Sequence, residues 1–482
     1  MQTEEMANHV MDVKREEDFR SRISDGLSPA TYEIGEGNFG EILRVSLPLV
    51  VSNAFHTVLT FTDRMFLSWH SQTSIAASVP ASILSFTFVC FFLATGQYVN
   101  VLTAQFFGAK QNDDVAKSLW QGIYFTVISA FIITLFIPLG NLIIDYSGHS
   151  PHVIEEEKLY FGILMLGGGL IVATAVLSSY FSGRSRTKIV MYFAIMGAIL
   201  NILFNYILIF GKLGFPSMGI RGAGIATVSA AGIVVVAYLF LIFLGKDRKT
   251  FPLIRMFGFD KRIFIKLIRF GVPSGFQFFV DLATFSAFIF LIGLQGDAIL
   301  AASNIVLSVN MLAFMPMAGM GMATAILVGQ YMGKMKQDVV IRVTYRTLKM
   351  AFIYGVLAGI AFFFFPEFFL SFFKGENGGS FSKIRAEAIP LFKILPVFLL
   401  CDCVAIVFGN ALNGVGDTRF KMWFVIAIAC LLFAPGESLI LGYFRLPAIY
   451  GWIFCSFYIF CFGFGFWLRF KQGKWRDIDM IE

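Results

Sequence analysis

The stretch IAASVPASILSFTFVCFFLATGQYVNVLTAQ, residues 75–105, contains no Asp, Glu, Lys or Arg from end to end. A helix that crosses the hydrocarbon core of a bilayer needs about 20 predominantly apolar residues. The stretch therefore predicts a membrane-spanning helix, and the proline inside it, Pro80, is tolerated in such a helix and often bends it. Because the stretch exceeds the minimum length, we expect this helix to be tilted, bent or extended beyond the bilayer.

The rest of the chain has the same character. Of its 482 residues 57% are hydrophobic and 14% are charged, and the mean hydropathy is +0.75. A soluble protein carries about 25% charged residues. The predicted spans are 42–66, 75–105, 118–144, 158–181, 188–210, 222–245, 262–294, 297–330, 343–373, 385–412, 420–443 and 448–468. We therefore expect an all-α integral membrane protein with twelve transmembrane helices.

The basic residues predict the orientation of these helices. If the chain alternates sides at each span, 29 of the 38 Lys and Arg residues fall on the side of the N-terminal tail. Cytoplasmic loops carry the excess of Lys and Arg, so both termini are predicted to be cytoplasmic. The net charge of +7 then reflects membrane orientation. No nucleic-acid-binding motif accompanies it, and we expect no nucleic-acid partner.

Motifs of the first half recur in the second half. Six spans in each half are an even number, so both halves insert in the same direction and form a parallel repeat. The sequence thus predicts two pseudo-symmetric six-helix lobes around a central cavity. The first three matches are offset by 225 residues and the last by 231: Arg44-x-x-x-Pro48 with Arg269-x-x-x-Pro273, Ala76-Ala77-Ser78 with Ala301-Ala302-Ser303, Gln105-x-x-Gly108 with Gln330-x-x-Gly333, and Gly183-x-x-x-Thr187 with Gly414-x-x-x-Thr418.

The loop richest in Lys and Arg, 246–269, joins the two halves and marks the boundary between them. The predicted organisation is a cytoplasmic N-terminal tail at 1–40, an N-terminal lobe at 41–245, a cytoplasmic linker at 246–261, a C-terminal lobe at 262–470 and a cytoplasmic C-terminal tail at 471–482.

Three acids stand within or near the ends of apolar spans: Asp63, Asp281 and Asp402. Each costs about 2.5–3.5 kcal/mol at the centre of a membrane helix, and such residues usually face a cavity on an ion or proton pathway. The alternative is structural: an acid paired with a buried cation, or one wet at the interface. Because Arg64 follows Asp63, this alternative is strongest for Asp63.

Polar side chains accompany these acids at helical spacing. Gln277 precedes Asp281 by four residues, so both lie on one helical face. Asn201 and Asn205 are likewise four apart, and Thr227 follows a run of small residues, 222–226. Oxygen atoms of carboxylate, amide and hydroxyl groups suit a hard cation. Hydrogen bonds between helices explain the asparagines equally well.

Several stretches resemble the multidrug and toxic compound extrusion (MATE) family, and its NorM branch in particular. The resemblance covers residues 37–470. The stretches that carry it are Leu47-Pro48-Leu49, Phe61-Thr62-Asp63, Ala104-Gln105-Phe106-Phe107-Gly108-Ala109, Asn201-x-x-x-Asn205, Gly222-Ala223-Gly224-Ile225-Ala226-Thr227, Pro316 and Gly329-Gln330-Tyr331-Met332-Gly333.

The resemblance implies an inverted-V fold of two six-helix lobes and alternating access driven by entry of Na⁺ or H⁺. Asp63 matches the acid of the N-terminal lobe, and the positions grouped with it at a Na⁺ site are Asn201, Asn205 and Thr227. Asp281 and Asp402 match the acids of the C-terminal lobe. Two positions depart from the NorM pattern: Asp281 stands where Glu is usual, and Phe398 stands where Tyr is expected.

The resulting hypothesis is a secondary antiporter that exports an organic, cationic or amphipathic compound in exchange for Na⁺ or H⁺. Gln277 is included with the acids as a cation-coupling or substrate-binding residue. The alternative is a flippase or exporter of a lipid-linked or endogenous metabolite, which would need basic residues in its cavity. Few Lys or Arg are expected within the spans, which favours cationic cargo. We expect no enzymatic activity, no cofactor besides the coupling ion, membrane lipid as surroundings, a monomer, and the cytoplasmic membrane if the source is bacterial.

Overall fold

The computed structural model describes residues 37–245, 250–373 and 378–480, and no β-strand occurs among them. Twelve helical segments in this part of the chain are long and apolar enough to cross a membrane, which confirms the predicted fold class. The first six are α2 (Phe39–His70), α3 (Gln72–Gln97) with α4 (Val99–Gly108), α5 (Asn112–Leu135) with α6 (Ile137–Asp145), α7 (Pro151–Ser182), α8 (Thr187–Phe210) and α9 (Gly219–Leu244).

The second six repeat this order. They are α10 (Lys261–Gly293), α11 (Asp297–Gly333), α12 (Gln337–Phe364) with the short α13 (Pro366–Ser371), α14 (Gly378–Val415), a segment from Thr418 to Tyr443, and α17 (Ala448–Lys471). The Thr418–Tyr443 segment comprises α15 (Thr418–Ile428), the π-helical turn η2 (Ala429–Phe433), α16 (Ala434–Glu437) and a second π-helical turn η3 (Ser438–Tyr443). A 3₁₀ turn, η4 (Lys474–Asp477), follows α17.

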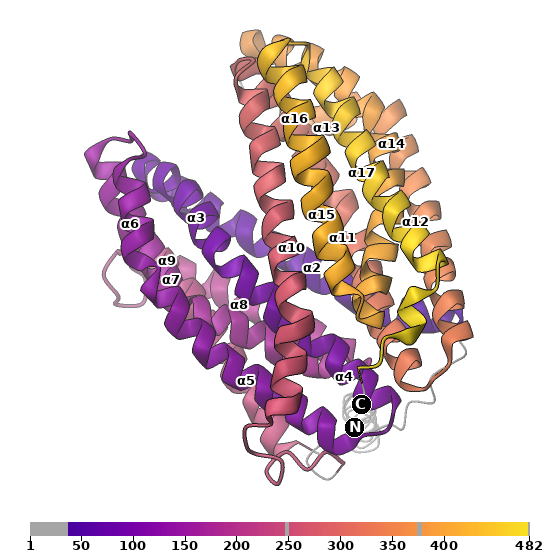
Figure 1. Cartoon of the computed structure of the whole chain (residues 1–482). Coiled ribbons are helices and arrows are strands. Elements are labelled where there is room, and N and C mark those ends of the chain that lie inside the picture. Colours follow the sequence, from indigo (N-terminus) through magenta and orange to yellow (C-terminus); the bar gives the residue numbers. More distant parts are fainter. Residues whose placement is uncertain (1–36, 246–249, 374–377, 481–482) are drawn as a thin grey trace, which may run out of the picture.

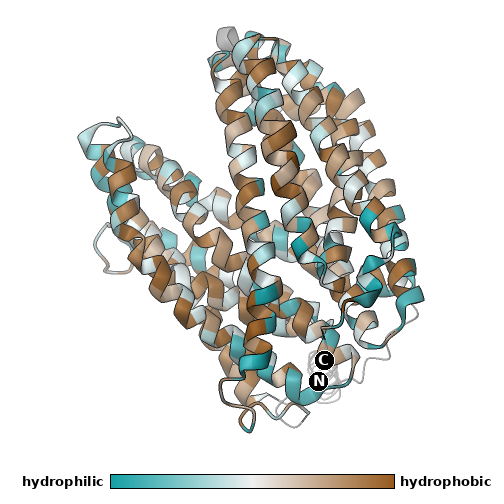
Figure 2. Ribbon diagram, viewed as in Figure 1, coloured by the Kyte–Doolittle hydropathy of each residue, from teal (hydrophilic) through white to brown (hydrophobic). Residues whose placement is uncertain are grey.

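The helices form two lobes arranged as a V, with α2–α9 in one arm and α10–α17 in the other (Figure 1). The arms meet at the end of the molecule that holds the start of α2 and the end of α17. We call this the closed end. Hydrophobic residues cover the lengths of the helices (Figure 2). Large side chains such as Phe131 and Phe290 are exposed there, as expected of a surface that faces lipid.

The first turns of α2 and of α10 each pack against helices of the opposite lobe. Ile42 and Val45 of α2 are buried in a cluster with residues of α11, α12, α14 and α17, which belong to the second lobe. Correspondingly, Leu267 and Phe270 of α10 are buried in the core of the first lobe. These pairs are separated by the same 225 residues as the sequence motifs. The internal repeat therefore describes a pseudo-symmetric contact between lobes as well as a repeated sequence.

At the closed end, α4 and α11 cross with their backbones in contact. A Cβ atom at Gly108 would lie 2.0 Å from the Gln330 carbonyl oxygen, and one at Gly333 would lie 1.9 Å from the Gln105 carbonyl oxygen. The Gln105 amide donates a hydrogen bond to the carbonyl of Gly414 at 2.9 Å, and the Gln330 amide donates one to the carbonyl of Gly183 at 2.6 Å. Each lobe thus binds the other through the same pair of repeated residues.

The C-terminal segment also joins this contact. Met480 is 1% exposed, and its backbone carbonyl accepts a hydrogen bond from Lys266 at 2.8 Å. Its sulfur lies 3.3 Å from the Gln105 amide nitrogen. The last described residues therefore pack between the lobes at the closed end.

Predicted boundaries and observed helices differ where prolines or bends occur. The predicted span 343–373 ends earlier, at Phe364, because Pro366 begins a new short helix. The predicted span 118–144 bends at Phe136, where α5 ends and α6 begins. Residues 1–36 of the predicted tail and 246–249 of the predicted linker lie outside the described residues. The division into the domains 41–245 and 262–470 stays a prediction, and the first turns of α2 and of α10 pack across it.

Candidate transport and cation sites

The four residues predicted to form a Na⁺ site in the first lobe are brought together. Asp63 lies on α2, Asn201 and Asn205 on α8, and Thr227 on α9. The Asn205 amide donates to the Asp63 carboxylate and, at 2.9 Å, to the Asn201 side-chain oxygen. The Asn201 amide in turn donates to the Thr227 hydroxyl at 3.1 Å. A continuous hydrogen-bond chain therefore links α2, α8 and α9.

The arrangement fits a hard monovalent cation. Asn201 and Asn205 are fully buried, and the side-chain oxygen of Asn205 has no hydrogen-bond partner among the described residues. A buried acceptor without a donor is costly, and a cation beside the Asp63 carboxylate would satisfy it. The Asn205 NH₂ group contacts the carboxylate in the present arrangement, so binding there would require the amide to rotate or move away. The hydrogen bond also identifies Asn205, rather than Arg64, as the described donor to Asp63.

Replacing Asp63 with Asn is expected to impair ion coupling. The change removes the negative charge that would attract a cation, and it sets two amides against each other at the Asn205 contact. Coupling energies between transport sites are about 1–3 kcal/mol, so ion-stimulated efflux should fall roughly fivefold or more. The measurement is the ion dependence of efflux in vesicles. If both efflux and its ion dependence match the wild type, the cluster has a structural role only.

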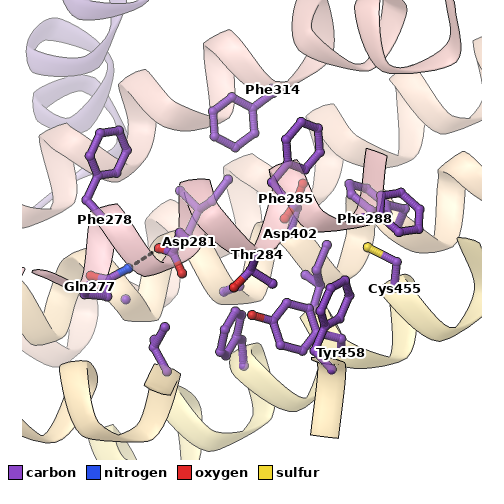
Figure 3. A pocket seen from close by; sticks show the side chains of 18 of the residues that line it. Gln277, Phe278, Asp281, Thr284, Phe285, Phe288, Phe314, Asp402, Cys455 and Tyr458 are labelled. Atoms are coloured by element: carbon purple, nitrogen blue, oxygen red, sulfur yellow. Dashed lines mark hydrogen bonds between the residues drawn. The ribbon is translucent and has the colours of Figure 1, made fainter. Parts of the chain in front are cut away.

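A separate cavity of about 430 Å³ lies in the second lobe. Asp281 and Gln277 line it from α10 and Asp402 from α14, so the predicted acids of this lobe face one space (Figure 3). The Gln277 amide donates to one oxygen of Asp281, whereas the other carboxylate oxygen is buried without a hydrogen-bond partner among the described residues. Asp402 is 9% exposed. These acids do not meet the Asp63 cluster, which lies in the other lobe.

Much of the cavity wall is aromatic. Phe278, Phe285, Phe288 and Phe314 surround the carboxylates (Figure 3). Phe398, the residue found where a tyrosine was expected, also lines the cavity and packs beside Trp452. Such a wall provides apolar contact area and ring faces that attract organic cations. Space, carboxylates and aromatic rings together suit an organic ligand with a positive charge.

Several polar residues of this cavity were not predicted from the sequence, among them Tyr458 and Lys421. Tyr458 of α17 brings a phenol into the cavity, and its hydroxyl points toward that of Thr284 (Figure 3). A phenol thus enters from a helix other than the one on which it was expected. Its position four residues before Phe462, in an apolar helix, gave no signal in the sequence.

Lys421 is the more important omission. It stands at the edge of the predicted span 420–443, a position at which a cation is typical of a cytoplasmic loop. Instead its side chain is 7% exposed and lines the cavity with Asp281 and Asp402. Its amine donates to the Asn413 side-chain oxygen at 3.3 Å, and its charge acts on the Asp281 carboxylate. The inference that cationic cargo is favoured because basic residues are scarce in the spans is therefore weakened at this cavity.

A second cavity, of about 320 Å³, lies between the lobes. Tyr98, Asn100 and Ser179 line it from the first lobe, while Gln277 and Lys421 belong to both cavities. The shared residues place the two cavities next to each other. A route from the interface between the lobes to Asp281 therefore passes Gln277 and Lys421.

Comparison with known proteins agrees with this geometry. The MatE family model matches residues 48–207 and 273–437, one segment in each lobe. The chain is 27% identical over 387 residues to a probable multidrug resistance protein NorM of Photorhabdus laumondii, covering 79% of this chain and 82% of that protein. It is 26% identical over 416 residues to a probable multidrug resistance protein NorM of Thermotoga maritima, covering 86% and 88%.

A solved structure has the same fold. It is described as the outward-facing conformation of a multidrug resistance MATE family transporter, and it matches with a TM-score of 0.80 at 20% sequence identity. The match covers 91% of this chain and 96% of that chain. Because the family model matches more than half of the sequence, this protein belongs to the MatE family and is a NorM-like MATE transporter.

Proposed function

We propose that the protein is a secondary antiporter that exports organic, cationic or amphipathic compounds in exchange for Na⁺ or H⁺. The observation that carries the proposal is the aromatic cavity that holds Asp281 and Asp402 within the second lobe. An organic cation bound there and an entering ion compete for the same carboxylates. Because the ion stabilises one conformation and the cargo the other, their exchange drives the lobes between two states.

The predicted orientation in the membrane gives the proposed direction of export. With the basic loops and both termini in the cytoplasm, the V opens toward the outside and the closed end faces the cell interior. In this state cargo leaves and the coupling ion enters from outside. One positive charge that moves inward contributes about 2.3 kcal/mol per 100 mV of membrane potential. We further propose that the protein works as a monomer, since each lobe has its own candidate site within one chain.

The direct test is ethidium efflux from proteoliposomes under an imposed Na⁺ gradient or an imposed pH gradient, each applied alone. We expect one gradient to accelerate efflux above the rate without a gradient, and that result identifies the coupling ion. Protein with all three acids neutralised, Asp63→Asn, Asp281→Asn and Asp402→Asn, serves as the control for passive leakage. Folded protein that moves ethidium under neither gradient would contradict the proposal.

The buried amine of Lys421 favours a second function, the transport of anionic compounds. Lys421 gives the cavity a buried positive charge, which is the feature required by a carrier of anionic, lipid-linked compounds. The two carboxylates outnumber this amine, so we favour cationic cargo. The alternative predicts that ethidium is not transported. It also predicts that a lipid-linked phosphate binds to the protein and that Lys421→Gln weakens this binding.

A further inference from the structure

Another acid within the predicted spans, Glu437, is more deeply buried than Asp63, Asp281 and Asp402. It is the last residue of α16, and its side chain is 0% exposed. Both carboxylate oxygens are buried without a hydrogen-bond partner among the described residues. It stands inside the predicted span 420–443 but is not among the predicted site residues. Neither the first-lobe cluster nor the second-lobe cavity includes it.

Its surroundings separate it from water but place it close to the cavity. Gly451 of α17 leaves room for the carboxyl group: a Cβ atom there would lie 3.1 Å from the Glu437 Oε2 atom. One turn further along α17, Cys455 lines the cavity. It lies close enough to Glu437 and to Asp402 to interact electrostatically with both carboxyl groups. Glu437 therefore lies just behind the cavity wall that faces Asp402.

The local backbone is unusual at the same point. α16 is a single helical turn between the π-helical turns η2 and η3. Short π-helical insertions within α-helices are rare and occur frequently at functional sites. Glu437 is also six residues from the end of this segment at Tyr443, away from the closed end (Figure 1). A buried acid within a predicted membrane span, next to such a backbone, is typical of an ion or proton pathway.

The protonation state follows from the missing partners. No Lys or Arg is paired with Glu437 among the described residues. The titratable groups of this half of the lobe on the elements packed against α16 include Cys430 of η2, Tyr443 of η3, Cys455 and Tyr458 of α17 and Asp281 of α10, with Asp402 of α14 nearby. None of them supplies a positive charge. A buried carboxylate without a counter-charge is strongly disfavoured, so the neutral acid is the stable form in this conformation.

We propose that Glu437 is a proton-binding site of the second lobe, loaded from the open end of the V. This inference rests on the proposed antiport and specifies H⁺ as the ion that enters through this lobe. When Glu437 releases its proton, its side chain becomes a carboxylate. When Asp402 takes up that proton, the Asp402 carboxylate becomes the neutral acid. Charge and protons balance in the transfer, and a neutral Asp402 no longer holds a cationic cargo.

Protonation of Glu437 can be tested without transport. Dicyclohexylcarbodiimide modifies protonated carboxyl groups in apolar surroundings, and mass spectrometry of peptides locates the adduct. With the purified full-length protein, we expect the peptide that contains Glu437 to be modified at neutral pH and its labelling to decline as the pH rises. The exposed Glu367, which pairs with Arg385, is the matched control and should stay unmodified. An unmodified Glu437 peptide at every pH would overturn the proposal.

A second measurement addresses coupling. Glu437→Gln keeps the shape of the neutral acid and removes its proton, so we expect roughly tenfold slower efflux under a pH gradient, with ethidium binding and thermal stability retained. Glu367→Gln should behave as the wild type. Full efflux in Glu437→Gln, or wild-type efflux driven by Na⁺ alone, would overturn the assignment of the proton to this site. If wild-type protein exports nothing, the antiport proposal fails by itself, while labelling still decides whether Glu437 binds a proton.

Discussion

Replacing Gly333 with Ala is expected to separate the lobes at their closed end and to reduce export about tenfold or more. The added Cβ atom would lie 1.9 Å from the carbonyl oxygen of Gln105 and 2.8 Å from its carbonyl carbon. Both are backbone atoms of α4, so no side chain can rotate to relieve the overlap. Overpacking of this kind costs about 1–3 kcal/mol or more, and each 1.4 kcal/mol is a tenfold change in population.

The cost falls on one conformation. Moving α4 away from α11 also carries Gln105 away from Gly414, and it separates Gln330 from Gly183. The V that opens away from the closed end is therefore the state that loses stability. Gly108→Ala, whose Cβ atom would lie 2.0 Å from the Gln330 carbonyl oxygen, should have the same effect by pseudo-symmetry.

The measurements are efflux from proteoliposomes and the thermal stability of the purified protein. Gly162→Ala is the matched control, because a Cβ atom at this helical glycine of α7 would meet nothing within 4 Å. Gln330→Leu removes the side-chain bonds without inserting an atom between the backbones, and we expect a smaller loss. Wild-type efflux and stability in Gly333→Ala would show that the close contact is not required.

Sequence analysis could predict features that depend on pattern and composition. The twelve spans follow from apolar runs, and the lobes follow from the repeated Gln105-x-x-Gly108 and Gln330-x-x-Gly333. The repeat did not reveal why these residues recur. That reason lies in the contact between α4 and α11, since each glutamine binds a glycine carbonyl of the opposite lobe. A pairing between residues some 300 or 150 positions apart leaves no mark in either local stretch.

The site was predictable to the same degree. Asn201 and Asn205 were recognisable by their spacing, because residues four apart share a helical face. Lys421 was not recognisable as a cavity residue, because a cation at the edge of a predicted span is typical of a loop. Its position in the cavity depends on how α15 packs against α10. Glu437 was detectable by the same criterion as the other acids, because it stands inside the predicted span 420–443. The π-helical turns on either side of it have no sequence signature in a single chain.

Neutralising the acids of the second lobe is expected to have the largest effect on transport. Asp402→Asn should leave the protein inserted and folded, because Asn has nearly the same shape and removes a buried charge. Export should fall by about tenfold or more, since the cavity loses a carboxylate for which ion and cargo compete. Asp297→Asn, the same chemical change at the exposed start of α11, is the control and should export normally.

Asp281→Asn should abolish export as well. A second variant is needed to tell whether export is lost because coupling is lost or because the protein is less stable. Lys421 is buried, and Asp281 supplies the negative charge that acts on it. Removing one member of such a buried pair typically costs about 3–5 kcal/mol, so lost export alone could reflect lost stability. The double variant Asp281→Asn/Lys421→Gln removes both charges. We expect it to regain thermal stability while ion-driven efflux stays absent, which assigns coupling to the carboxylate. If the double variant recovers efflux together with stability, the role of Asp281 is to neutralise Lys421. If transport is unchanged in both single variants, Asp281→Asn and Asp402→Asn, this lobe has no coupling site.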